Sequence, residues 1–516
     1  MRALAPAAIA GTLAAAVAVG VAELVAAAVR PESAPLVAVG AAVIDATPGP
    51  VREFAVRGFG TADKAVLLSG ILVLLALFAA GIGVLAVDRP RWGLVGVGGF
   101  GLVGVAAVAS RPAFRLVDLL PSVVGTVAGG LMLLRLRRPL AVAVSSGAEP
   151  SDPVEVTEPA AIDRRGFLVV GGTAAVVAGA SGALGRIWQG VRTVAARSRE
   201  AVRLPRPTSP APPLPARADL GVPGAGPFLT PNASFYRVDT ALVVPERAAE
   251  RWTLTVHGMV DRSLTLTYQD LLGLPIVERV VTLTCISNEV GGEYLGTARW
   301  LGPLLRDVLA GAGVDPAADQ IVCRSSDGMT IGTPARIALD GRDAMLAIGM
   351  NGEPLPVEHG FPVRMVVPGL YGYCSACKWL VDMELTTFGA YDAYWVSRGW
   401  ARFGPVLTQS RVDTPAASSR LAPGRVPVAG VAWAQHRGIA GVEVRVDGGP
   451  WQPATLADQA SLDAWRQWVF WWEASPGRHT LAVRATDGAG ALQPERRSAP
   501  FPSGATGWHT VTVTVG

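Results

Sequence analysis

The sequence has few charged residues and few cysteines. Asp, Glu, Lys and Arg make up 17% of the 516 residues, whereas a soluble globular chain carries about a quarter. With half of the residues hydrophobic, this shortage excludes an ordinary cytosolic protein and a disordered one. Four cysteines are too few for a disulfide scaffold. The basic residues stand singly at the ends of apolar runs, where membrane proteins place them, so we expect no nucleic-acid partner.

The apolar residues are concentrated in the first 200 positions. We expect residues 1–200 to form a membrane anchor with about five transmembrane helices, because about 20 apolar residues cross a bilayer core of about 30 Å. The expected spans are residues 5–29, 65–87, 92–110, 116–134 and 167–185. A cleaved signal peptide is the alternative interpretation of the first span, since Arg2 precedes it.

The arginines at the ends of these spans predict their orientation. Arg2, the cluster at 135–138 and the pair Arg164–Arg165 fall on one side if the first four spans alternate, and the positive-inside rule makes that side cytoplasmic. We therefore expect a multi-pass protein of a bacterial plasma membrane, with everything after residue 186 outside the cytoplasm. The pair Arg164–Arg165, followed by Phe167 and Leu168, resembles a twin-arginine export signal; an ordinary basic flank is the alternative.

The chain after residue 200 has the pattern of a water-soluble protein. A Pro-rich stretch, residues 201–222, predicts an extended linker. Residues 223–412 show strand-like alternation mixed with a short helical segment, which predicts an α+β domain. Residues 413–516 hold short strand-like segments separated by turn signals such as Asp447-Gly448-Gly449. That spacing predicts a small β-sandwich.

Cys285 ends an apolar strand-like run and is followed by the glycine turn 289–293. Taken alone, a buried structural cysteine is the better interpretation. The surrounding segments, however, resemble the sulfite oxidase family of molybdopterin enzymes, in order, over about residues 225–516. The segments that carry the resemblance are Cys285-x-x-Asn288, residues 296–302, 305–309, 359–364 and 367–369, and Lys378-Trp379. Residues 428–433, 444–449 and 484–487 are similar to that family's immunoglobulin-like dimerisation domain.

This resemblance implies an enzyme with a molybdenum–molybdopterin cofactor that transfers one oxygen atom and two electrons. The Cys285 thiolate is implied as the metal ligand, and Arg364 fits a phosphate because arginine binds phosphate bidentately. The positions implied to bind the cofactor are Tyr236, Arg237, Thr240, Cys285, Ser325, His359, Arg364, Ala376, Cys377 and Lys378. Asn288, Tyr394 and Arg437 are the predicted substrate contacts. The sequence does not distinguish molybdenum from tungsten.

The chain departs from the family pattern beside the cysteine. Sulfite-oxidising members carry an arginine pair where this sequence has Glu289 and Val290. A carboxylate near the metal would repel the sulfite dianion, so we expect a neutral sulfoxide or N-oxide as the small-molecule substrate. The catalytic subunit of methionine sulfoxide reductase also lacks the pair, but it has no C-terminal sandwich. The pair Cys374 and Cys377 is open to two interpretations, a redox dithiol and small side chains packed beside the pterin.

None of the five histidines lies in an expected span, which excludes a membrane-embedded bis-histidine haem there. We expect no haem in the soluble part either, so a separate electron carrier, a quinone or a cytochrome, is predicted. The resemblance of the last hundred residues to a dimerisation domain implies a homodimer. The alternative from another class is a membrane receptor or scaffold that keeps the molybdopterin-type fold without catalysis.

Overall fold

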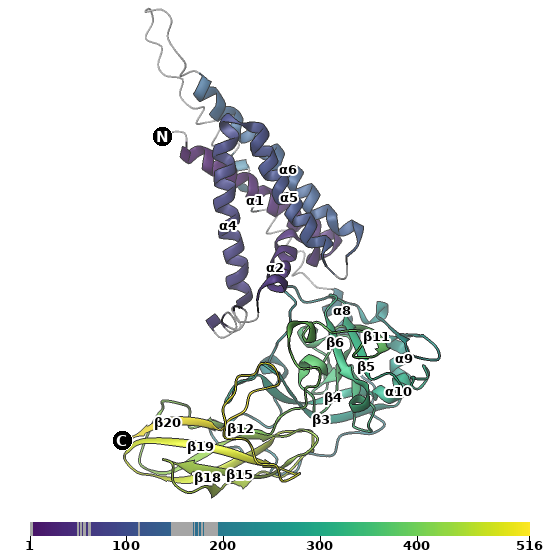
Figure 1. Cartoon of the computed structure of the whole chain (residues 1–516), viewed down its shortest axis with the longest axis vertical. Coiled ribbons are helices and arrows are strands. Elements are labelled where there is room, and N and C mark those ends of the chain that lie inside the picture. Colours follow the sequence, from purple (N-terminus) through teal and green to yellow (C-terminus); the bar gives the residue numbers. More distant parts are fainter. Residues whose placement is uncertain are drawn as a thin grey trace, which may run out of the picture. The chain divides into compact units, whose positions relative to one another are not determined.

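The computed structural model describes residues 4–48, 63–111, 114–145 and 194–516, with isolated residues between 51 and 59 and between 169 and 179. The chain divides into two compact units (Figure 1). One comprises residues 1–193 and 240–244, and the other comprises residues 194–239 and 245–516. Most of the expected fifth span, the twin-arginine segment and most of the loop before it lie outside the described residues.

The first unit is helical. Its helices are α1 (Leu4–Val29), α2 (Pro35–Ala46), α4 (Asp63–Asp88), α5 (Pro90–Ala109) and α6 (Leu120–Ser145), with short 3-10 turns η1 (Pro31–Ser33) and η3 (Leu116–Leu119). Among the described residues, four helical segments are long and apolar enough to cross a membrane: Leu4–Val29, Lys64–Asp88, Pro90–Ala109 and Leu116–Arg138. They coincide with the first four expected spans.

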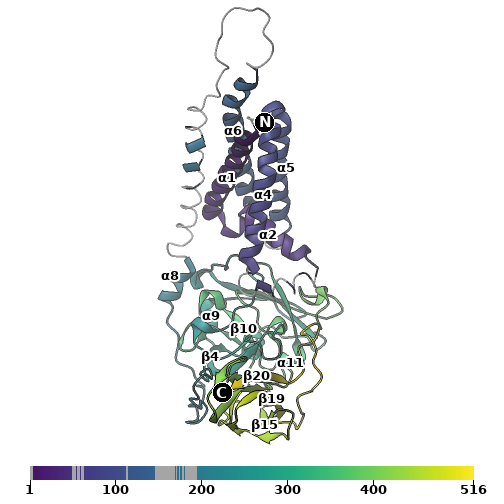
Figure 2. The ribbon, with the colours of Figure 1, turned by 90° about the vertical axis from the view of Figure 1, so that its left-hand side faces the viewer.

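Small residues let α1 pack closely against α4 and α6, which lie beside it in Figure 2. A Cβ added to Gly125 of α6 would lie 2.6 Å from the Ala18 carbonyl oxygen of α1. One added to Gly83 of α4 would lie 2.2 Å from the Ala7 carbonyl oxygen. Gly125 and Gly129 are four residues apart on one face of α6, a spacing typical of closely packed helices in membranes.

The second unit begins with α8 (Val194–Ala201) and holds three sheets of the α+β part. The first is β2 (Leu264–Thr267), β1 (Thr253–Gly258), β11 (Leu380–Thr386), β5 (Gln320–Ser325) and β6 (Thr330–Pro334), with β1 and β11 parallel. The second is β3 (Ile276–Thr284), β4 (Leu295–Pro303), β8 (Gly349–Met350) and β9 (Glu353–Pro354). The third pairs β10 (Arg364–Val366) with β7 (Met345–Ala347). Short helices α9 (Tyr268–Leu272), α10 (Leu305–Leu309) and α11 (Ala335–Ala338) lie between strands.

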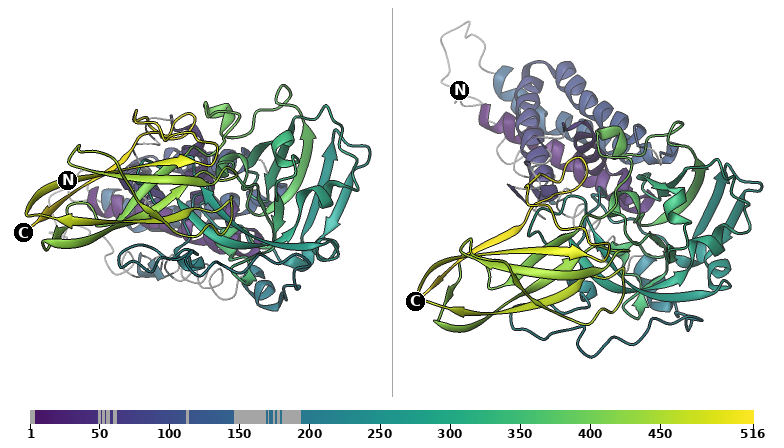
Figure 3. Two further views of the ribbon diagram at one scale, coloured as in Figure 1. Left: turned by 90° about the horizontal axis from the view of Figure 1, so that it is seen from below. Right: turned by 60° about the horizontal axis from the view of Figure 1, so that its bottom comes forward.

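The last hundred residues form two antiparallel-rich sheets around one core (Figure 3). One sheet is β12 (Gln409–Thr414), β14 (Gly424–Trp433), β18 (Arg466–Ala474) and β17 (Thr455–Leu456). The other is β13 (Arg420–Leu421), β20 (His509–Val515), β19 (Gly477–Asp487), β15 (Ile439–Val446) and β16 (Gln452–Pro453). Val428 and Trp468 of the first sheet pack with Val444 and Leu481 of the second, so the two sheets form a sandwich.

The Pro-rich stretch is extended, as expected, but it is also anchored. Its Thr208 amide donates to the Ile276 carbonyl at 2.7 Å, and the Glu278 amide donates to Ser209 at 2.9 Å. Near its end, Leu220 donates to the Gln467 side chain. The segment therefore covers part of the open edge of β3 and reaches the sandwich, so it is more than a free spacer.

Candidate active site

Strand β3 delivers Cys285 into the interior. The thiol is 8% exposed, and the Cys285 amide donates to the Tyr294 carbonyl at 2.9 Å, which closes the loop between β3 and β4. Burial raises the pKa of the Cys285 thiol, while a hydrogen bond with Ser287 and the charge of Lys378 offset part of that rise. A thiol must lose its proton to bind a metal, and the lysine charge favours that loss.

The turn after Cys285 is held from within. The side-chain oxygen of Asn288 accepts from the Tyr294 amide at 2.8 Å, and Asn288 is 7% exposed. This contact means that Asn288 closes the turn, in addition to its predicted role as a substrate contact. Glu289 is exposed, so water screens its carboxylate, and the repulsion of sulfite expected from the sequence loses most of its strength. Val290 is buried.

An aromatic wall stands next to the cysteine. Tyr236 stacks on Phe235 with ring centroids 5.3 Å apart and lies 6.5 Å from the ring of Tyr294. Burial raises the pKa of Tyr236, the thiol of Cys285 raises it further, and Arg364 opposes the rise. Tyr236, Cys285 and Arg364 therefore lie close enough to interact, which joins three of the predicted cofactor residues into one cluster.

A basic cluster lies beside this wall. Arg364, at the start of β10, is 5% exposed and donates to the His359 carbonyl at 3.1 Å. Burial lowers the pKa of Arg364 to about 10 and, helped by the charges of Arg364 and Lys378, lowers the pKa of His359 to about 4. His359 is therefore neutral near pH 7. Its Nε2 lies 3.3 Å from the Asn232 carbonyl oxygen.

Two further predicted residues share one carboxylate. Lys378 Nζ lies 2.6 Å from Asp239, and Arg237 Nε lies 2.8 Å from the same carboxylate oxygen. Burial lowers the pKa of Lys378 to about 8, although Asp239 opposes that shift. With Arg364 nearby, three cations face the carboxylates of Asp239 and Glu358, so the cluster has an excess of positive charge that suits a phosphate.

Unpaired buried groups test whether a cofactor fits. Within the described part of the chain, Arg364 Nε and Ser325 Oγ are buried without a hydrogen-bond partner. Buried polar groups are normally paired, and a polar, anionic molecule between β5 and β10 would supply the missing acceptors. The residues present therefore fit a molybdopterin with its phosphate.

The loop before Lys378 holds the two cysteines. Cys374 is 1% exposed, and its sulfur lies 3.3 Å from the Tyr371 carbonyl oxygen. Burial raises the pKa of Cys374 to about 12 and also raises that of Cys377. Because thiolates are the reactive form, these shifts favour packing over a redox dithiol. The Ala376 amide donates to Gly372 at 3.0 Å, and the Cys377 carbonyl accepts from β10.

The remaining predicted residues are less closely joined to the cluster. Arg437 pairs with Asp487 at 2.9 Å and donates to the Val406 carbonyl at 2.9 Å, so it anchors the sandwich. The Tyr394 ring lies under the guanidinium of Arg398, 3.5 Å from its centroid. Thr240 belongs to residues 240–244, which group with the helical unit.

Sequence reasoning missed Tyr371. It is 3% exposed, and burial and the charge of Cys285 raise its pKa to about 12, with Arg437 opposing. Tyr371 is therefore a buried residue close enough to interact with both the predicted metal ligand and the predicted substrate arginine. Its position two residues after the segment 367–369 was the signal available in the sequence.

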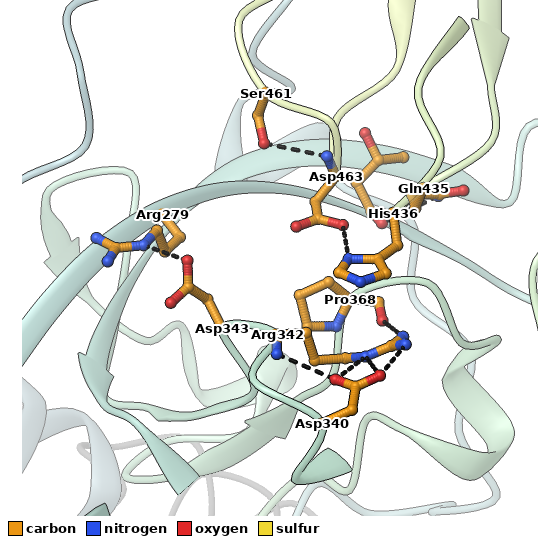
Figure 4. A network of polar contacts seen from close by, with 10 residues as sticks. Arg279, Asp340, Arg342, Asp343, Pro368, Gln435, His436, Ser461 and Asp463 are labelled. Atoms are coloured by element: carbon orange, nitrogen blue, oxygen red, sulfur yellow. Dashed lines mark hydrogen bonds and ion pairs between the residues drawn. The ribbon is translucent and has the colours of Figure 1, made fainter. Parts of the chain in front are cut away.

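Polar contacts of the sandwich and of the α+β part lie near one another where the two meet (Figure 4). His436 points toward Asp463, with 3.3 Å between Nδ1 and Oδ1, and Arg342 is paired with Asp340. The Arg342 guanidinium also donates to the Pro368 carbonyl at 2.7 Å. This hydrogen bond fixes the segment 367–369 that precedes Tyr371.

Comparison with known proteins identifies the α+β part. Residues 241–395 match the model of the oxidoreductase molybdopterin binding domain. Mitochondrial sulfite oxidase of Homo sapiens is 32% identical over 317 residues, which cover 52% of this chain and 58% of that protein. The α+β part therefore contains a molybdopterin-binding oxidoreductase domain that is similar to sulfite oxidases.

Other relatives match the chain at lower identity or over a smaller share of it. Sulfite oxidase of Gallus gallus is 29% identical over 52% of this chain and 68% of its own length. NADH nitrate reductase 1 of Oryza sativa subsp. japonica is 36% identical over 32% of this chain and 21% of its own length. The chain thus spans less than two thirds of the human relative. The crystal structure of the sulfane dehydrogenase SoxCD from Paracoccus pantotrophus has a TM-score of 0.50 at 24% identity, covering 56% of this chain and 82% of that chain. It shows a shared fold.

Proposed function

We propose that this protein is a membrane-anchored molybdopterin-dependent oxidoreductase. It transfers one oxygen atom and two electrons to or from a small sulfur- or nitrogen-oxide substrate, outside the cytoplasm of a bacterium. The observation that carries the proposal is the buried cluster of Cys285, Tyr236 and Arg364, with unpaired polar atoms inside the family domain.

The chain's own residues prepare and hold the cofactor. The Cys285 thiolate is the metal ligand, and soft sulfur suits it to a metal that also binds a dithiolene. Arg364, Lys378 and Arg237 hold the phosphate, and neutral His359 adds a hydrogen-bonding group. When bound, the cofactor supplies the two-electron oxygen-atom chemistry. Asn288, Tyr394 and Arg437 remain the proposed substrate contacts, and the buried Tyr371 is added to them.

The substrate follows from the charge beside the cysteine. Because Glu289 is exposed, its carboxylate only weakly opposes an anion, while the arginine pair of sulfite-oxidising members is absent. We retain a neutral sulfoxide or N-oxide as the first substrate class and sulfite as the comparison in every assay.

The surroundings of the active site are part of the same proposal. Four apolar helices support a multi-pass anchor, with domain boundaries near residues 200, 222 and 412. The twin-arginine segment would export the folded, cofactor-loaded domain. The sandwich is proposed as an immunoglobulin-like domain that pairs two chains. Electrons pass to a separate carrier, without haem in this chain.

Metal and pterin analysis of the purified full-length protein tests the proposal. We expect about one molybdenum per wild-type chain and loss of metal or turnover in Cys285→Ser. The matched control is Cys323→Ser. Cys323 is also a buried cysteine of this unit, but it lies in β5 and its sulfur contacts the sulfur of Met365 in β10. Wild-type protein free of metal and pterin, made in a host that assembles the cofactor, would instead support the receptor or scaffold alternative.

A further inference from the structure

The helical unit holds an apolar cavity of about 200 Å³ between α1, α2, α4, α5 and α6. The small residues that allow α1 to pack closely, such as Ala14 and Ala18, also leave this space. Among its 23 lining residues, all of them described, only Ser122 and Thr126 carry a polar side chain. The cavity therefore suits a largely apolar molecule with few hydrogen-bonding groups.

Ser122 places one unused hydrogen-bond donor in this cavity. The side chain is 3% exposed, and its Oγ has no partner within the part of the chain that the structure describes. The neighbouring hydroxyl is already engaged, because Thr126 Oγ1 donates to the Ser122 carbonyl at 2.6 Å. A buried hydroxyl without a partner calls for an acceptor, and the apolar walls offer a water molecule too few additional polar contacts.

A buried carboxylate lies four residues before this hydroxyl. Asp118 is 1% exposed and accepts from Arg30 Nη2 and the Arg115 amide, both at 2.9 Å and both on Oδ2. Its other oxygen, Oδ1, has no partner among the described residues. Buried ionisable groups in apolar helical bundles are costly and mark functional positions. Asp118 itself does not line the cavity, whose polar side chains are Ser122 and Thr126.

We infer that this cavity binds a membrane quinone. Quinone carbonyls accept hydrogen bonds and donate none, which matches the free Ser122 hydroxyl, while the isoprenoid tail matches the apolar walls. The ring of Phe100, which also lines the cavity, offers an aromatic contact for the flat headgroup. An acyl chain alone would leave Ser122 without an acceptor, and a charged phospholipid headgroup would not fit among Gly104, Pro35 and Leu36.

This inference rests on the proposed function, because the oxidoreductase requires an electron carrier. Reducing a quinone to a quinol takes up two electrons and two protons. Oxidation of the substrate by one oxygen atom releases two electrons, which reduce one quinone. In the opposite direction, oxidation of one quinol supplies the two electrons that reduce the substrate. The buried Asp118 carboxylate, four residues before Ser122, is a group that can exchange one of the protons.

Binding is measured by titrating the full-length protein, embedded in lipid nanodiscs, with menaquinone-4. We expect saturable binding at about one molecule per chain. Ser122→Ala should raise the dissociation constant about three- to tenfold, as expected for one lost hydrogen bond. Val97→Phe places a ring in the cavity and should raise it at least tenfold. The control is Val95→Phe on the same helix, because Val95 is 61% exposed and does not line the cavity.

The competitor squalene tests whether the quinone ring matters. Displacement of menaquinone-4 by squalene at equal concentration, or equal weakening by Val95→Phe and Val97→Phe, would show that the cavity only holds hydrocarbon and would overturn the inference. Molybdenum content and turnover with an artificial electron carrier are measured in the same samples. Loaded, active protein that binds no quinone contradicts the inference alone, whereas metal-free protein contradicts the proposed function.

Discussion

Gln435, in the sandwich, donates to Thr284 in the α+β part: Gln435 Nε2 lies 2.9 Å from Thr284 Oγ1 and 3.1 Å from the Thr282 carbonyl oxygen. Thr284 immediately precedes Cys285. The Thr282 amide on the same strand donates to the Asp463 carbonyl at 2.9 Å. The sandwich therefore satisfies the open edge of β3 and fixes the strand that presents the predicted metal ligand.

Replacing Gln435 by Leu should destabilise this junction. Both acceptors are on buried residues, and a buried acceptor that loses its donor costs about 1–3 kcal/mol. We expect the free energy of unfolding of the second unit to fall by about that amount in a denaturant titration, with reduced molybdenum retention. Gln452→Leu is the control, because Gln452 is exposed on the same sandwich. Equal losses in both variants would contradict the role of the junction.

The turn after Cys285 should not tolerate a side chain at Gly291. Its φ is +81°, and an added Cβ would lie 2.3 Å from Nε2 of His509. Gly291→Ala should therefore cost more than the about 1–2 kcal/mol of left-handed backbone strain. Gly448→Ala isolates that strain, because Gly448 has φ +72° and open space around its Cβ. Chemical denaturation of both variants makes the comparison.

A double variant separates the clash with the His509 ring from the backbone strain at residue 291. Adding His509→Ala to Gly291→Ala should recover part of the lost stability relative to the sum of the single changes. Strict additivity would mean that the ring does not press on the turn.

The His509 ring predicts acid sensitivity. Burial, helped by the charges of Arg411 and Arg497, lowers the pKa of His509 to about 4, and its Nδ1 accepts from the Val412 amide at 3.0 Å. Because the unfolded chain binds a proton below about pH 6.5 and the folded one does not, stability is unaffected above that pH. It should fall as pH drops from about 6.5 to 4, by up to about 3 kcal/mol.

His509→Gln should flatten part of this decline, measured as the free energy of unfolding at pH 7, 6, 5 and 4. His359, whose pKa is also about 4, lowers the free energy of unfolding over the same pH range. The contribution of His509 is therefore the difference between the wild-type and His509→Gln curves. His479→Asn is the control. Its pairing with Asp447 raises the pKa of His479, and the stability from that exposed pair is present at low pH and lost as pH rises. An unchanged slope in His509→Gln would refute the prediction.

Lys378 predicts how cofactor uptake depends on pH. Burial lowers the pKa of its amine to about 8, so above that pH the cofactor-free protein loses one cation of the phosphate cluster. We expect molybdopterin uptake by the cofactor-free protein to fall as pH rises from 7 to 9. Lys378→Arg should retain uptake at pH 9, because arginine stays charged. The matched control Lys64→Arg changes a lysine of the helical unit and should keep the wild-type pH profile.

Much of this architecture was predictable from sequence because its determinants are local. Runs of about 20 apolar residues predicted the helices α1, α4, α5 and α6, and alternation predicted β1 and β3. The order of the segments around Cys285 identified the molybdopterin domain, since a cofactor site keeps its residue types and spacing. Cys285, Tyr236 and Arg364 do come together.

The roles of individual polar residues depended on neighbours that are distant in sequence. The sequence by itself predicted the four apolar helices and the molybdopterin-binding domain, because periodicity and spacing act over a few positions. The individual cofactor residues stay predictions. Only the tertiary structure showed Glu289 exposed, Arg437 held by Asp487, Tyr371 beside the cysteine and Ser122 unpaired in a cavity. Burial and hydrogen-bond pairing are set by packing between elements, and a linear pattern contains no record of which side chains meet there.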